Sequence, residues 1–222
     1  MHQPIQRIFG SLLVCIGRHV FHYSLQATWA QGRVTIVGAG LPSTGVSSLR
    51  VALEKIGYKV AGVEVFDESA AYREVWRNWL QAGQSPEPVY QELIGRGYNA
   101  FVGEPFSSAY SYIMMRDPSA RVILTVHNAS LLKWYKGFSK ALQPWRRFGR
   151  HWWMDWSFND HLEFRRSFHN GWGCSVLGPS PQVRISTEDQ CINAHKRYIV
   201  EVKQTVPSNK LLVYDVKEGW RP

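Results

Sequence analysis

The sequence predicts an α/β domain with a central parallel sheet and helices on both of its faces. Short runs of β-branched and apolar residues alternate with helix-length amphipathic segments, as in βαβ units. The predicted strands cover 34–37, 59–66, 99–102, 121–127 and 211–214, and the predicted helices cover 46–56, 71–81, 89–95, 106–115, 131–142 and 187–206. A chain of 222 residues is long enough for one such domain with a sizeable core.

The first βαβ unit carries the clearest chemical signal. The run 34–37 suits a strand that is buried on both faces, and Gly40 and Gly45 let the following loop turn tightly and approach a ligand. Ser47 and Ser48 stand at the start of the next helix, where free backbone N–H groups gather. A glycine-rich loop that leads into a helix is typical of a phosphate site. An ordinary βα turn without a ligand is the alternative.

Two general templates compete for this loop. The spacing Gly40-x4-Gly45-Val46-Ser47 is that of a Walker A loop, but Val46 stands where the lysine should be, so ATP or GTP hydrolysis is not expected. The pair Gly38-x-Gly40 resembles a dinucleotide fingerprint without its third glycine, and Glu64 could then hold a ribose. An NAD(P)-binding Rossmann-type oxidoreductase is therefore an alternative, although no Tyr-x-x-x-Lys constellation supports it.

Composition narrows the class of protein and of partner. Hydrophobic residues make up 45% and charged residues 19%, as in a globular chain. The net charge of +9 favours anionic ligands, and the basic residues are dispersed with no nucleic-acid motif, so nucleic acid is not the expected partner. Cys15, Cys174 and Cys191 are widely spaced without a Cys-x-x-Cys pair. We therefore expect reduced thiols, no metal centre and a cytoplasmic protein.

Two segments flank or interrupt the predicted domain. Residues 1–32 contain no Asp or Glu and have an apolar run at 8–16 that is too short to span a membrane. We interpret 1–32 as an N-terminal extension, with an organelle-targeting segment or a secretory signal as alternatives. Residues 144–186 are rich in Trp, Phe and Arg. We interpret them as a helical insertion whose tryptophans pack on the sheet, with membrane-surface contact, single-strand binding or a lid as alternatives.

Two stretches resemble a sulfotransferase-like family of P-loop proteins. The loop Gly40-Leu-Pro-Ser-Thr-Gly-Val-Ser-Ser-Leu49 resembles that family's Gly-x-x-Arg-Thr-Gly-Thr-x-Ser-Leu loop. The segments 193–207 and 211–220, the latter reading Leu-Leu-Val-Tyr-Asp-Val-Lys-Glu-Gly-Trp, are close to the family's C-terminal pattern. The resemblance covers 33–220 and is weakest between 144 and 186. It implies one domain over 33–222 with the three-layer P-loop NTPase-like fold.

The resemblance also implies an activity. Members transfer a sulfuryl group from 3′-phosphoadenosine 5′-phosphosulfate (PAPS) to a hydroxyl or amine, without a metal, and the acceptor here would be a small molecule, a glycan or a lipid. Glu64 matches a family glutamate and is the candidate general base. The residues that would contact the donor are Ser43, Thr44, Gly45, Val46, Ser47 and Ser48 at the phosphosulfate, with His127 and Lys136 near the 3′-phosphate.

The chain departs from the family pattern at donor positions. Ser43 replaces a basic residue, Val46 a threonine, His127 an arginine and Gly137 a serine. A catalytically degenerate nucleotide-binding homologue is therefore an alternative function. Family members continue past Gly-Trp into another helix, whereas this sequence stops at Pro222, so the resemblance implies that part of the donor pocket is missing.

Overall fold

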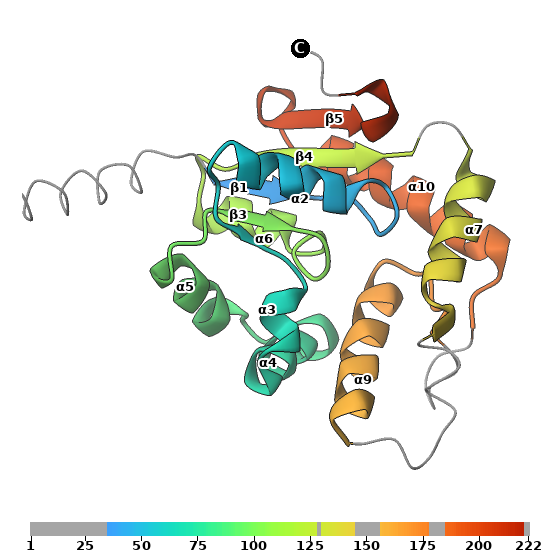
Figure 1. Ribbon diagram of the computed structural model, residues 1–222, viewed down its shortest axis with the longest axis horizontal. Helices are drawn as coiled ribbons and strands as arrows, with labels where there is room; N and C mark the ends of the chain where they lie inside the picture. The colour runs from blue at the N-terminus through green and yellow to red at the C-terminus, as the bar shows by residue number, and fades with distance from the viewer. Residues whose placement is uncertain (1–34, 128–129, 145–155, 178–184, 220–222) are drawn as a thin grey trace, which may run out of the picture. The chain divides into compact units, whose positions relative to one another are not determined.

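The computed structural model describes residues 35–127, 130–144, 156–177 and 185–219 (Figure 1). The chain divides into two units, residues 1–34 and 35–222, and only the second is described below. The predictions for the N-terminal segment 1–32 therefore lie outside the described residues. None of the helices within the described ranges is both long and apolar enough to cross a membrane.

A five-stranded parallel sheet forms the centre of the domain, with the strand order β2-β3-β1-β4-β5. The strands are β1 (Ile36–Gly38), β2 (Val60–Ala61), β3 (Ala100–Val102), β4 (Arg121–Val126) and β5 (Leu211–Asp215). The helices are α2 (Val46–Lys55), α3 (Glu64–Asp67), α4 (Ala70–Ala82), α5 (Glu87–Gly95), α6 (Tyr110–Arg116), α7 (Leu131–Ala141), α9 (Trp156–Gly171) and α10 (Glu188–Thr205), with short 3-10 turns at Ser208–Lys210 and Val216–Glu218. The predicted α/β class, with a parallel sheet between helices, is confirmed.

The two faces of the sheet bury alternate residues of each strand, as the two-residue period of a strand requires. Ile36, Ala100 and Val102 pack with Leu49 and Leu53 of α2 in one small core. The neighbouring strand positions instead join a larger core that includes side chains of α6 and α10: Val37, Phe101, Val122, Leu124, Ile113, Tyr198 and Val202. In Figure 1, α2 accordingly lies in front of the sheet and α6 and α10 behind it.

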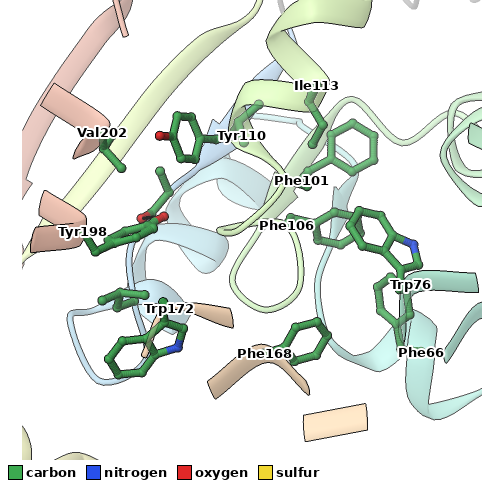
Figure 2. Close-up of a cluster of buried hydrophobic side chains, with 14 of the residues drawn as sticks. Phe66, Trp76, Phe101, Phe106, Tyr110, Ile113, Phe168, Trp172, Tyr198 and Val202 are labelled. Atoms are coloured by element: carbon green, nitrogen blue, oxygen red, sulfur yellow. Dashed lines mark hydrogen bonds between the residues drawn. The ribbon is translucent and has the colours of Figure 1, made fainter. Parts of the chain in front are cut away.

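Aromatic side chains dominate the larger core (Figure 2). The rings of Trp76 and Phe106 each lie 5.5 Å from that of Phe66, and Phe164 of α9 stacks on Phe66 at 5.2 Å. The insertion predicted at 144–186 thus supplies core residues through α9. Its one tryptophan with a described side chain, Trp172, is buried against Trp134 and against Phe138 of α7, whereas residues 145–155 lie outside the described ranges.

The second predicted strand, 59–66, is wrong over most of its length. β2 ends at Ala61, and the chain turns at Gly62 into the short helix α3. The Gly62 N–H donates to the carboxylate Oε1 of Glu64 at 3.0 Å, and the Phe66 N–H donates to the Val63 carbonyl at 3.0 Å. The run 59–66 is apolar, which predicts a buried strand. Val65 and Phe66 are indeed buried, but they belong to the helix α3. The helix predicted at 106–115 likewise starts later, at Tyr110.

The expectation of reduced thiols is wrong for two of the three cysteines. Cys174, in the turn after α9, and Cys191, in the first turns of α10, form a disulfide with their Cα atoms 4.7 Å apart. Both residues are fully buried. Spacing could not reveal this bond, because it depends on how α9 and α10 approach one another.

Candidate functional site

The loop between β1 and α2 is shaped by a close approach to β4. A Cβ atom at Gly40 would lie 1.7 Å from the hydroxyl oxygen of Thr125, so only glycine fits there. The buried Thr44 hydroxyl donates to the Leu41 carbonyl at 2.7 Å and lies 2.7 Å from the Thr125 hydroxyl. The hydroxyl that sequence reasoning assigned to a ligand is therefore used inside the loop.

The end of this loop presents free N–H groups at the start of α2. Gly45 precedes the helix with φ 100°, and the first intrahelical bond runs from the Leu49 N–H to the Gly45 carbonyl at 3.0 Å. The N–H groups of Val46, Ser47 and Ser48 consequently have no carbonyl to bind within the helix. The side chains of Ser47 and Ser48 are exposed beside them. An anion would find both the N–H groups and the positive end of the helix dipole here.

Two aromatic residues from distant parts of the chain hold the loop in place. The Trp134 Nε1–H donates to the Pro42 carbonyl at 2.8 Å. The Tyr198 hydroxyl lies 2.8 Å from the Ala39 carbonyl and 2.6 Å from the Ser107 carbonyl, so its one proton is shared between two acceptors. Burial raises the pKa of the Tyr198 hydroxyl well above its usual value, so Tyr198 remains a donor at any physiological pH. The sequence predicts only that Tyr198 lies in the helix at 187–206.

A cavity of about 240 Å³ opens beside the loop, at the carboxyl ends of β1, β2 and β3. Ligands of open α/β sheets bind at this edge. Its walls combine the loop and α2 with the segments that follow β2 and β3 and with α9. Four charged side chains line it: Arg50, Glu64, Glu104 and Arg165. Three predicted donor residues line the same cavity, namely Ser43, Val46 and Ser47.

Glu64, the predicted base, lies in this cavity with both carboxylate oxygens engaged. Oε2 is 2.6 Å from Nη1 of Arg50, and Oε1 accepts the Gly62 N–H. The Glu64 side chain is about one-third exposed. Glu64 falls within the predicted strand 59–66, but in the structure it belongs to α3, after the end of β2.

The segment 144–186, for which a lid was one alternative, supplies a wall of the cavity through α9, but no residue of that wall was predicted. Arg165 lines the cavity and lies 3.7 Å from Asp67, and His169, one helical turn further, lies behind Glu104. Asp160 holds this helix against α4: its carboxylate binds the Nε of Arg73 at 2.6 Å and Nη1 of Arg77 at 2.8 Å. The only signal available beforehand was the basic and aromatic composition of 144–186, which does not specify a wall.

The predicted 3′-phosphate residues lie apart from this cavity. His127 directly follows β4 and is half-buried, and Lys136 is exposed on α7. Neither lines the cavity. The ring of His195 lies 4.2 Å from that of Trp134, and burial, with a smaller contribution from the charge of His127, lowers the pKa of His195 to about 4. Gly137 is exposed, and a Cβ there would meet no atom within 4 Å.

A parallel sheet with a clamped glycine loop, free N–H groups and a charged cavity at the strand ends is typical of phosphate-binding α/β proteins. Residues 35–222 match the family model described as "Sulfotransferase domain", and the chain belongs to this sulfotransferase family. This confirms the family expected from the loop and the C-terminal segment. A comparison with curated proteins finds no match to this chain.

Proposed function

We propose that the chain transfers a sulfuryl group from PAPS to a hydroxyl or amine of an acceptor. The observation that carries the proposal is the loop at the start of α2, where free N–H groups and exposed serines adjoin a cavity that contains two arginines. Sulfotransferases generally use PAPS as the donor, and membership of the family supports the same donor here. A cavity of about 240 Å³ suits a small acceptor or a single group of a larger one.

In this proposal the donor's phosphosulfate binds along residues 43–48. The N–H groups of Val46, Ser47 and Ser48 and the serine hydroxyls supply donors to its oxygens. The Thr44 hydroxyl and Gly45 shape the loop instead of reaching out from it. His127 and Lys136 remain our prediction for the 3′-phosphate. The family resemblance implies Glu64 as the base, a role that we reassign below.

Arg50 and Arg165 place positive charge in the cavity beside Ser43, where the family's loop has a basic residue. Sulfuryl transfer moves negative charge onto the leaving phosphate, so a positive group near that oxygen stabilises the transition state. Both arginines line the cavity beside Ser43, although Arg50 is paired with Glu64. We propose that they supply the charge that a basic residue in the loop supplies elsewhere in the family.

Donor binding is tested by thermal unfolding with adenosine 3′,5′-bisphosphate, with ATP and NADH as controls. A ligand at one hundred times its Kd stabilises by about 2.7 kcal/mol, and each kcal/mol moves the Tm of a chain of this size by roughly 2–4 °C. We therefore expect a rise of about 5–11 °C with the bisphosphate alone. A rise with NADH alone would instead favour the dinucleotide-binding oxidoreductase.

The second candidate, a nucleotide-binding homologue without turnover, rests on Ser43 and Val46. It predicts the bisphosphate shift without sulfated product. Ser43→Arg then restores the family's cation, and Ser208→Arg, an exposed site on the 3-10 turn before β5, is the matched control for added charge. A gain of transfer with Ser43→Arg but not with Ser208→Arg would identify the missing cation as the defect. Equal transfer in all three proteins would show that the cavity arginines suffice.

The Cys174–Cys191 bond bears on the compartment. Disulfides persist mainly in oxidising compartments. We therefore propose a secretory location for this chain in place of the cytoplasmic one expected from cysteine spacing. Alkylation of cells before lysis, followed by mass analysis, tests this: protected Cys174 and Cys191 support it, and alkylated ones contradict it.

A further inference from the structure

A second carboxylate, that of Glu104, lies in the cavity and differs from Glu64 in its surroundings. Glu104 follows β3 directly after Gly103, and its side chain lines the cavity although it is only 10% exposed. Its Oε1 atom is fully buried and has no hydrogen-bond donor among the residues that the structure describes. A buried carboxylate oxygen without a donor is costly, so its presence beside a cavity needs a reason.

An imidazole lies beside this oxygen. Nε2 of His169 is 3.2 Å from Glu104 Oε1 without forming a hydrogen bond, and the His169 side chain is 2% exposed. His169 Nδ1 is likewise buried and has no hydrogen-bond partner within the described ranges. Glu104 and His169 thus form a buried carboxylate–imidazole pair at the wall of the cavity.

Both carboxylate oxygens of Glu64 are already engaged. Oε2 is paired with the Arg50 guanidinium, and Oε1 accepts the Gly62 N–H. Glu104 has no such arginine within the ion-pair distance in the described part of the chain, and it faces the same cavity as Ser43 and Ser47 of the donor loop.

We infer that Glu104, backed by His169, is the general base that takes the proton of the acceptor hydroxyl. The inference rests on the proposed sulfuryl transfer. The acceptor oxygen forms a bond to the donor's sulfur, and the bond from sulfur to the bridging phosphate oxygen breaks with its electron pair left on the phosphate. The acceptor proton moves to the Glu104 carboxylate and is then shared with His169 Nε2. Glu64 serves to orient Arg50 toward the transferred group.

The test uses two acceptors that differ in their need for a base. At mildly alkaline pH, 4-nitrophenol is largely ionised, whereas phenol retains its proton. With PAPS as donor, Glu104→Gln should lower transfer to phenol by about 100- to 10,000-fold and transfer to 4-nitrophenol less than 10-fold. Glu64→Gln, the matched carboxylate-to-amide change in the same cavity, should lower transfer to both acceptors by similar factors. The bisphosphate thermal shift should be unchanged in Glu104→Gln.

Two results would overturn the inference and leave the proposed function standing. One is that Glu104→Gln lowers transfer to both acceptors equally, and the other is that Glu64→Gln lowers transfer to phenol alone. If Glu104→Gln does not fold, Glu104→Asp retains a carboxylate one methylene shorter and should lower the ratio of phenol to 4-nitrophenol transfer. An unchanged ratio would count against Glu104. A wild-type chain that binds the bisphosphate but transfers to neither acceptor overturns the inference while donor binding stands. A chain that neither binds nor transfers contradicts the proposed function itself.

Discussion

Tyr198→Phe tests whether the loop between β1 and α2, the proposed donor site, depends on its clamp from α10. The change removes a single oxygen, which now lies 2.8 Å from the Ala39 carbonyl and 2.6 Å from the Ser107 carbonyl. The ring remains in the core, so no large cavity forms. A buried acceptor left without its donor costs about 1–3 kcal/mol. At roughly 2–4 °C per kcal/mol, we expect the Tm to fall by about 2–12 °C.

Tyr110→Phe is the matched control, because it removes the same atom from a neighbouring aromatic residue. The Tyr110 hydroxyl lies 3.4 Å from Glu201, a longer contact made outside the loop. Its loss should lower the Tm less, and affinity for the bisphosphate should fall only in Tyr198→Phe. Circular dichroism melts and bisphosphate titrations give both readouts. Equal Tm losses in the two variants, or unchanged affinity in Tyr198→Phe, would refute a clamp that shapes the proposed donor site.

Three further predictions concern stability. The free energy of unfolding should fall by up to about 3 kcal/mol between about pH 6.5 and about pH 4, because His195 binds a proton at its ordinary pKa in the unfolded chain but only at a pKa of about 4 in the folded one. His195→Gln should flatten this fall in urea titrations. Asp160→Ala should lower the free energy of unfolding by about 3–5 kcal/mol, because the charge of Arg73, whose side chain is 5% exposed, loses its carboxylate partner. Cys174→Ser should cost about 3 kcal/mol, because the bond to Cys191 closes a 17-residue separation.

Each of these has a contrasting measurement. A pH profile identical in wild type and His195→Gln would contradict the His195 argument. Arg116→Ala breaks an exposed ion pair with Glu87 and should cost less than about 1 kcal/mol, so a loss equal to that of Asp160→Ala would show that burial does not set the effect. Without reductant, the denatured protein should titrate one thiol, that of Cys15. Three thiols would mean that the disulfide is absent.

The main elements of the sheet could be predicted because their signals are local. The run before Gly38 is apolar and β-branched, and the start of α10 bears a Thr187–Gln190 capping box that the structure contains. β2 could not be predicted at its true length, because Val65 and Phe66 are as apolar as strand residues. In the structure they lie in α3, where the Glu64 carboxylate accepts the Gly62 N–H, and composition does not reveal that contact.

The candidate site was predictable on its loop side and not on its far wall. Ser43, Val46, Ser47 and Glu64 share a cavity because strand ends and the loops after them meet at one edge of a parallel sheet. The packing of α9 on α4 brings Arg165 and His169 to Glu104. In the sequence, both residues lie more than 60 positions after Glu104. Single-sequence patterns hold no information about such contacts.

The contact between Tyr198 and Ala39 spans 159 residues, and this fixes an order of events during synthesis. When the ribosome has made β1 and α2, Tyr198 has not yet been synthesised. The Ala39 carbonyl of the loop therefore lacks the hydroxyl that binds it in the folded protein. The loop acquires its hydroxyl clamp only after Tyr198 in α10 has emerged. Because such long-range contacts form slowly, the proposed donor site should mature after most of the chain has been translated. A nascent chain released before residue 198 would carry the loop without its clamp.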